Sequence, residues 1–134
     1  MDPIFLTAEE VLEIHVQQID RYGGSHGVRE MAVLESAVAM PQATFGGEFL
    51  HRSIPAMAAA YLFHICQNHP FIDGNKRAGA NAAVTFLFMN DWDLSLDEDE
   101  FTDLVLSVAS SEMDKAELTA IFDGRCCRRD LIKS

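Results

Sequence analysis

The nine residues His69-Pro-Phe-Ile-Asp-Gly-Asn-Lys-Arg77 join two apolar segments and combine a glycine, a histidine, an acid and two adjacent cations. The first backbone N–H groups of a helix lack intrahelical partners and the helix dipole favours negative charge, so a glycine-bearing loop that leads into a helix is a site for anions. The positive end of the helix dipole repels the two cations Lys76 and Arg77 at such a helix start. A bound anion would offset this repulsion, which suggests that the site binds a phosphate. His69 and Asp73 in the same loop indicate chemistry on that phosphate.

The residues of this loop each have a predicted role and a simpler interpretation. An ordinary imidazole is mostly neutral at pH 7, so His69 can take a proton from a hydroxyl nucleophile, although a lone loop histidine is usually a polar surface residue. Asp73 can ligate Mg²⁺ together with phosphate oxygens, or it can simply occupy an Asp-Gly turn. Gly74 permits a positive φ and close approach of a ligand, and Asn75 can cap a helix or hold a phosphate. Burial of the Phe71 ring would anchor the loop.

The segments on both sides of the loop have helical patterns. Ser53 is a predicted cap for a helix that carries an apolar stripe to about residue 68, with Pro55 tolerated in its first turn. Another helix is predicted from about Asn75 to Asn90. Because few of its residues are polar, we expect this helix to be central and buried, and its alanines would let neighbouring helices approach closely.

Further helices are predicted on both sides of this pair. Thr7 and Glu10 form a capping box for a helix that Gly23 and Gly24 end. The helical pattern returns in three more segments, which lie at about residues 31–40, 97–108 and 114–122.

The non-helical segments are short. Gly46 and Gly47 between apolar residues predict a hairpin or extended flap within residues 42–51. A turn is expected at residues 91–93, and the polar tail from about Gly124 is expected to fray. The sequence therefore predicts an all-α protein: one compact domain over residues 1–134, with about six helices and one short irregular or β flap.

Composition fits an ordinary globular domain and narrows the choice of partners. The chain has 134 residues, 49% of them hydrophobic and 23% charged, with a formal net charge of −11. That charge argues against direct binding of nucleic acid, which needs a positive surface, and it fits a basic or amphipathic peptide partner. The longest apolar run is shorter than the roughly 20 residues of a membrane-spanning helix, and the N-terminus does not have the pattern of a signal peptide.

The three cysteines show neither metal-ligand spacing nor a framework of disulfides. This pattern is typical of a protein in a reducing cytoplasm. The adjacent residues Cys126 and Cys127 receive no role from the sequence.

The loop resembles the signature of the Fic/Doc family, His-x-Phe-x-Asp/Glu-Gly-Asn-Gly/Lys-Arg at the start of a buried helix. The chain is most similar to the death-on-curing (Doc) toxins of that family, which share Asn-Lys-Arg in the loop and an opening helix that ends in Arg-Tyr-Gly-Gly, here residues 21–24. The resemblance covers about residues 4–123. It implies a Fic/Doc-type helical bundle and an enzyme that uses ATP and Mg²⁺.

The resemblance also implies residue roles. In the family the histidine deprotonates a target hydroxyl and the acidic residue holds Mg²⁺, which corresponds to His69 and Asp73. The loop's amides and cations hold nucleotide phosphates, and the corresponding residues here are Gly74, Asn75, Lys76 and Arg77. A flap aligns the target by strand-like pairing, a role that would fall to Thr44, Phe45, Gly46, Gly47, Glu48 and Phe49.

Departures from the family pattern bear on which group is transferred. AMP-transferring members have glycine at the position of Lys76 and a second arginine at that of Ala80. Doc toxins carry the lysine and transfer a phosphate to elongation factor Tu, but have alanine at the position of Gly74. The resemblance therefore favours a phosphotransferase, with AMP transfer (AMPylation) as the alternative. A non-catalytic module that binds an anion or a nucleotide is a third hypothesis.

Some family members carry a self-inhibitory helix with a Ser/Thr-x-x-x-Glu motif, and no such helix is predicted for this chain. The resemblance therefore implies a separate restraint. We expect a small antitoxin protein that binds in trans.

Overall fold

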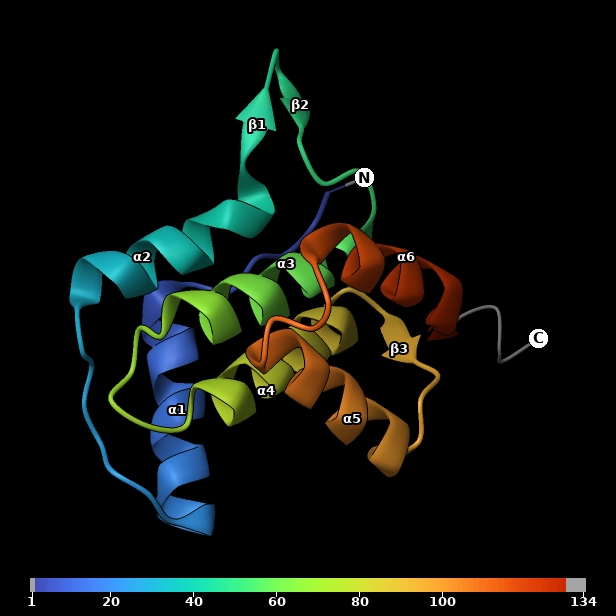
Figure 1. Ribbon diagram of the computed structural model, residues 1–134. Helices are drawn as coiled ribbons and strands as arrows, with labels where there is room; N and C mark the ends of the chain where they lie inside the picture. The colour runs from blue at the N-terminus through green and yellow to red at the C-terminus, as the bar shows by residue number, and fades with distance from the viewer. Residues whose placement is uncertain (1, 130–134) are drawn as a thin grey trace.

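The computed structural model describes residues 2–129 and confirms the all-α prediction. Two antiparallel pairs of short strands, β1 with β2 and β3 with β4, accompany the helices (Figure 1). In chain order the elements are α1 (Ala8–Tyr22), α2 (Met31–Ala39), the 3₁₀ turn η1 (Met40–Gln42), β1 (Thr44–Phe45), β2 (Glu48–Phe49), α3 (Ile54–Asn68), α4 (Asn75–Met89), β3 (Trp92–Leu94), α5 (Glu98–Ala109), α6 (Lys115–Arg125) and β4 (Cys126–Arg128).

Local capping signals start most of these helices. The hydroxyl of Thr7 accepts from the Glu10 N–H at 3.1 Å, and the Glu10 carboxylate accepts from the Thr7 N–H at 2.9 Å. The same reciprocal pair opens α5 at Asp97 and α6 at Asp114, while the Ser53 hydroxyl caps α3. Each pair satisfies N–H groups that a helix leaves unpaired at its start, which is why the predicted starts are close to those observed.

The expectation that α4 would be central and buried is wrong, because α3 is the central helix and α4 is buried on one face only. Helices α2, α4, α5 and α6 all pack against α3. One face of α4 meets α3 closely, because a Cβ at Gly79 would lie 3.3 Å from the Leu62 carbonyl oxygen. The opposite face of α4 leaves Val84 42% exposed and Phe88 64% exposed. The apolar composition of α4 predicted that this helix is buried, but composition does not show how many of its faces are covered by other elements.

The predicted flap is a hairpin that projects from the helices (Figure 1). Thr44 pairs with Phe49, and Phe45 pairs with Glu48. Gly46 and Gly47 have φ angles of 60° and 81°, the positive values that a tight two-residue hairpin turn requires. The spacing Ser/Thr-x-x-x-Glu does occur in the chain, at Thr44 and Glu48, but here it forms this hairpin and not an inhibitory helix.

The C-terminal segment pairs with the strand that follows α4. β4 is antiparallel to β3, with Asp93 opposite Cys127. The predicted frayed tail from Gly124 is therefore wrong for residues 124–129, while its remainder lies outside the described residues. Burial raises the pKa of the Cys126 thiol to about 12, so this cysteine stays a thiol at neutral pH.

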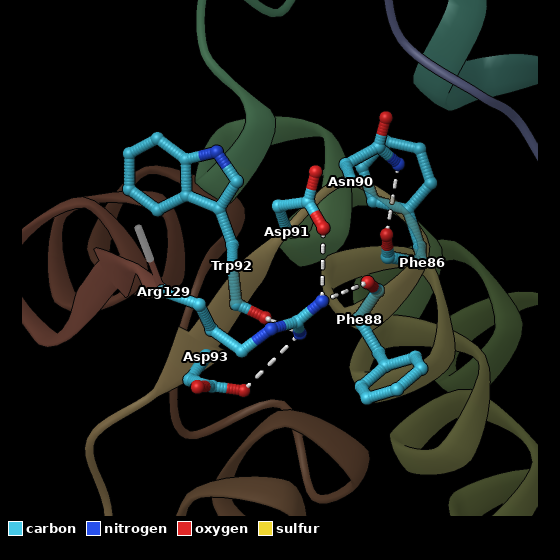
Figure 2. A network of polar contacts seen from close by, with 7 residues as sticks. All are labelled: Phe86, Phe88, Asn90, Asp91, Trp92, Asp93 and Arg129. Atoms are coloured by element: carbon cyan, nitrogen blue, oxygen red, sulfur yellow. Dashed lines mark hydrogen bonds and ion pairs between the residues drawn. The ribbon is translucent and has the colours of Figure 1, made fainter. Parts of the chain in front are cut away.

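Arg129 fastens this segment to the end of α4, as Figure 2 shows. Its guanidinium forms ion pairs with Asp91 at 3.0 Å and Asp93 at 3.5 Å. It also donates to the Phe88 carbonyl at 3.0 Å and lies over the Phe88 ring, 4.4 Å from its centroid. The stack covers part of an aromatic ring that is otherwise exposed.

The N-terminal segment reaches the same end of α4. The Ile4 N–H donates to Asn90 Oδ1 at 2.8 Å, and the Asn90 amide donates to the Ile4 carbonyl at 3.0 Å. Both terminal segments are thus tied to the turn after α4.

None of the helices within residues 2–129 is long and apolar enough to cross a membrane.

Candidate active site

The loop at residues 69–74 joins α3 to α4, and its first residue leaves the helix in an unusual conformation. His69 has φ 49° and ψ 58°, in the left-handed region that few residues other than glycine adopt. Pro70 follows, and a proline disfavours the right-handed helical conformation in the residue before it. The His69 side chain is exposed, and its imidazole has no hydrogen-bond or ion-pair partner in the described part of the chain. The ring is therefore available to a substrate.

Arg29 holds the backbone at His69. Its Nε donates to the His69 carbonyl at 2.7 Å, and its Nη2 donates to the Asn68 carbonyl at 2.8 Å. These are carbonyls that the end of α3 leaves without intrahelical partners, so Arg29 acts as a C-terminal cap. The segment around Arg29 also runs along the loop, since its own N–H donates to the Pro70 carbonyl at 2.8 Å and Val28 bridges to Phe71.

Phe71 anchors the middle of the loop against α1. Its ring is 1% exposed and lies parallel to the His15 ring, with centroids 3.8 Å apart and an interplanar angle of 2°. His15 is fully buried, and desolvation lowers its pKa, so the ring is neutral. Sequence reasoning assigned His15 no role. His15 lies four residues from both Val11 and Ile19, and this helical spacing with two apolar residues was the signal in the sequence that His15 is on the buried face of α1.

The Asp73 carboxylate is exposed and held by backbone donors. Oδ2 accepts from the Ser25 N–H at 3.1 Å, and Oδ1 accepts from the Gly74 N–H at 2.8 Å. These two bonds lower the pKa of the Asp73 carboxyl, so it is ionised. Gly24 is needed beside it, because a Cβ there would lie 2.7 Å from Oδ2.

An ionised, exposed carboxylate with free lone pairs fits a divalent cation. Within residues 2–129 no cluster of three or more acidic, histidine or cysteine side chains forms a complete cation cage. Mg²⁺ is commonly held by one or two carboxylates together with substrate phosphates and water, so Asp73 suits that ion in the presence of a nucleotide.

The start of α4 brings the other predicted residues together, but they are engaged differently. Gly74 precedes the helix with φ 78°, and the Asn75 side chain bonds both the N–H and the carbonyl of Phe71 at 3.0 Å. Arg77 donates to the Gly23 carbonyl at 2.9 Å, at the end of α1. Lys76 is exposed and has no hydrogen-bond or ion-pair partner among the described side chains and backbone groups. Lys76 and the helix N–H groups are thus the most available donors to an anion.

A groove of about 530 Å³ lies beside these cations, between α1, α4 and α5. Its lining includes Lys76 and Arg77 together with the aromatic rings of Tyr22 and Phe101. No local sequence pattern predicts this groove, because its walls come from three separate helices.

The hairpin is not joined to the loop in this structure. Throughout residues 2–129, no hydrogen bond or ion pair links residues 44–49 to residues 69–77. Phe45 is 81% exposed, and the hairpin edge is free to pair with another chain.

The amino-acid sequence is similar to known proteins over most of its length. Residues 5–87 match the Fic/DOC family. The chain is 38% identical over 105 residues to "Toxin Doc" of Mycolicibacterium smegmatis, covering 77% of this chain and 81% of that protein. It is 31% identical over 108 residues to "Protein kinase doc" of Escherichia phage P1, covering 81% of this chain and 84% of that protein. The match spans the helix of His15, the hairpin, the loop and nearly all of α4, and the chain therefore belongs to the Fic/DOC family.

Proposed function

We propose that this protein is the toxin of a toxin–antitoxin pair and that it transfers the γ-phosphate of ATP, with Mg²⁺, to a hydroxyl side chain of a protein target. The names of the two relatives, a toxin and a protein kinase, support the proposal. The single observation that carries it is the arrangement around the start of α4: the loop holds an exposed imidazole at His69 without a hydrogen-bond partner in the described structure and an ionised carboxylate at Asp73, and the first turn of the helix holds the exposed Lys76.

The transfer balances as a simple displacement. His69 takes the proton from the target hydroxyl, whose oxygen forms a bond to the γ-phosphorus. The bond from that phosphorus to the bridging oxygen breaks, and ADP leaves. Asp73 would hold Mg²⁺, which neutralises charge on the phosphates. Lys76 and the free N–H groups of α4 stabilise charge that develops on the transferred group, and such fixed donors are the main source of catalysis in phosphoryl transfer.

The groove lined by Tyr22 and Phe101 gives the nucleoside a place to bind beside Lys76. Aromatic faces of this kind stack on bases. With the nucleoside there, its phosphates would lie near Lys76 and the start of α4.

The partners belong to the same proposal. By resemblance to the family the target is elongation factor Tu, and its modification would inhibit translation. A small antitoxin that binds in trans would restrain the toxin, and the free hairpin edge would align the target segment by strand pairing.

ATP labelled separately at its α- and γ-phosphates tests the proposal. The full chain, Mg²⁺ and purified bacterial elongation factor Tu, or a bacterial lysate, are incubated with each label. We expect protein-bound label from the γ position only. Label from the α position only would establish AMP transfer instead. Nucleotide binding without transfer from either position would show a non-catalytic module.

A further inference from the structure

We propose that His15 is a positioning residue for the Asp73 carboxylate, acting from α1 beneath the loop. The inference rests on the proposed function, because it assigns His15 a part in holding the site for Mg²⁺. His15 does not reach a substrate, since its side chain is fully buried.

One peptide unit links the imidazole to the carboxylate. His15 Nε2 lies 2.6 Å from the main-chain carbonyl oxygen of Asp73. The carbonyl of Asp73 and the N–H of Gly74 belong to the same planar peptide unit. That N–H donates to Asp73 Oδ1 at 2.8 Å. The hydrogen bond from His15 to the Asp73 carbonyl holds this peptide plane in place. It therefore also holds the Gly74 N–H, which orients the Asp73 carboxylate.

The direction of the hydrogen bond fixes the tautomer of the ring. A carbonyl only accepts, so Nε2 of His15 carries the proton, and Nδ1 of a neutral ring has none. Nδ1 is buried and has no partner in the described residues. The parallel contact with Phe71 holds the plane of the ring.

Packing alone does not explain a histidine at this place. A buried polar atom without a partner destabilises the folded state, and an apolar ring of similar shape would avoid that cost. The hydrogen bond to Asp73 is the contact that such a ring could not make. Groups that orient a metal ligand in this way typically change metal affinity about 10–100-fold when they are removed.

Two substitutions separate the hydrogen bond from the stacking. His15→Phe keeps a ring against Phe71 and removes the donor, while His15→Gln removes the ring and offers an amide N–H at a similar reach. His51→Phe is a matched control, because His51 is also buried with an unpartnered Nδ1 but lies away from the loop.

The measurement is binding of a non-hydrolysable ATP analogue to the full chain as Mg²⁺ is varied, with EDTA as the metal-free reference. We expect His15→Phe to raise the Mg²⁺ concentration for half-maximal binding by about 10–100-fold. Binding in EDTA should stay as in the unsubstituted protein. His15→Gln should recover part of the loss, and His51→Phe should change nothing.

An unchanged Mg²⁺ dependence in His15→Phe, while the unsubstituted protein responds to Mg²⁺, overturns this inference and leaves the proposed function intact. If the unsubstituted protein binds the analogue equally with and without Mg²⁺, the metal-dependent part of the proposed function fails, and the inference fails with it. Nitrogen NMR of the unsubstituted protein needs no variant: a proton on Nδ1 of His15 in place of Nε2 would also overturn it.

Discussion

The loop at residues 69–77 and the hairpin at residues 44–49 are both irregular segments of a helical protein, but the structure holds them differently. The loop is fixed from three sides, by α1 beneath it, by the segment at Arg29 and by its own Asn75. The hairpin is held by its own strand pairing and by the contact of Phe49 with Phe5, and its Phe45 ring is 81% exposed. Chemistry at a phosphate depends on fixed geometry, whereas alignment of a target depends on an edge that is free to pair.

The largest expected effect is on the rate of phosphate transfer when His69 of the loop is replaced. His69→Ala should reduce γ-phosphate transfer about 10²–10⁴-fold, because general-base catalysis contributes roughly that factor. The melting temperature should hardly change, since the imidazole has no partner in the described structure. Initial rates of label transfer and thermal melting measure the two quantities. His26→Ala is the control, because this exposed histidine pairs with Asp20. An unaltered rate in His69→Ala removes this residue from the mechanism.

The next effect compares one phenylalanine from each segment. Phe71→Ala should lower the free energy of unfolding by about 3–5 kcal/mol, because it empties a buried site against His15. Phe45→Ala should change it by less than about 0.5 kcal/mol, since the ring is exposed. Urea unfolding of both variants gives the comparison. Equal losses would show that the loop is not anchored through Phe71.

A pH effect is expected from a basic cluster close to the base of the hairpin. His64 accepts from Lys115 at 2.9 Å, and burial together with Lys115 and His51 lowers the pKa of His64 to about 4. The unfolded chain therefore binds more protons between about pH 6.5 and pH 4, so the free energy of unfolding falls as the pH falls through that window. After allowance for partial exposure the effect is on the order of 2 kcal/mol.

His64→Gln tests this cluster, because glutamine keeps an acceptor for Lys115 and does not titrate. Urea unfolding at pH 7 and pH 4.5 should show a smaller loss of stability in the variant than in the unsubstituted protein. Equal losses would mean that other groups cause the pH dependence.

The smallest effect compares two arginines. Arg29→Ala should lower the free energy of unfolding by about 1 kcal/mol, because it removes an exposed cap from the end of α3. It should also reduce transfer, because the same cap holds the backbone of His69. Arg52→Ala is the match: Arg52 is 73% exposed and pairs with Glu48 of the hairpin, so a change near zero is expected. Transfer rates at the unsubstituted level in Arg29→Ala would show that His69 keeps its place without the cap.

Helix starts and the loop could be predicted because their signals are local. Thr7 and Glu10 are three residues apart, as are Asp97 and Glu100, and capping needs nothing from the rest of the chain. The grouping of His69, Asp73 and Lys76 likewise lies within one short stretch of sequence. Which phosphate is transferred stays a prediction that the label experiment addresses.

The supports of the loop could not be predicted because they are distant in sequence. His15 is 58 residues from Asp73, and Arg29 is 40 residues from His69. The pairing of β4 with β3 depends in the same way on contacts that no local pattern encodes. The contact of Arg77 with the Gly23 carbonyl at the end of α1 could not be predicted either, because a cation at the start of one helix does not indicate a partner in another helix.

The attachment of both terminal segments to the turn after α4 fixes where tags and fused partners can be placed. α4 has 15 residues and so separates that turn from the loop by about 22 Å, at 1.5 Å per residue. Ile4 is bonded to Asn90 and Arg129 to Asp91, both at the far end of α4, and Figure 2 shows Arg129 there. A fluorophore, an affinity tag or a tether to a surface joined after Arg129 would therefore be attached at the end of α4 that is far from residues 69–74, whereas the N-terminal segment also lies beside the hairpin, where Phe5 contacts Phe49.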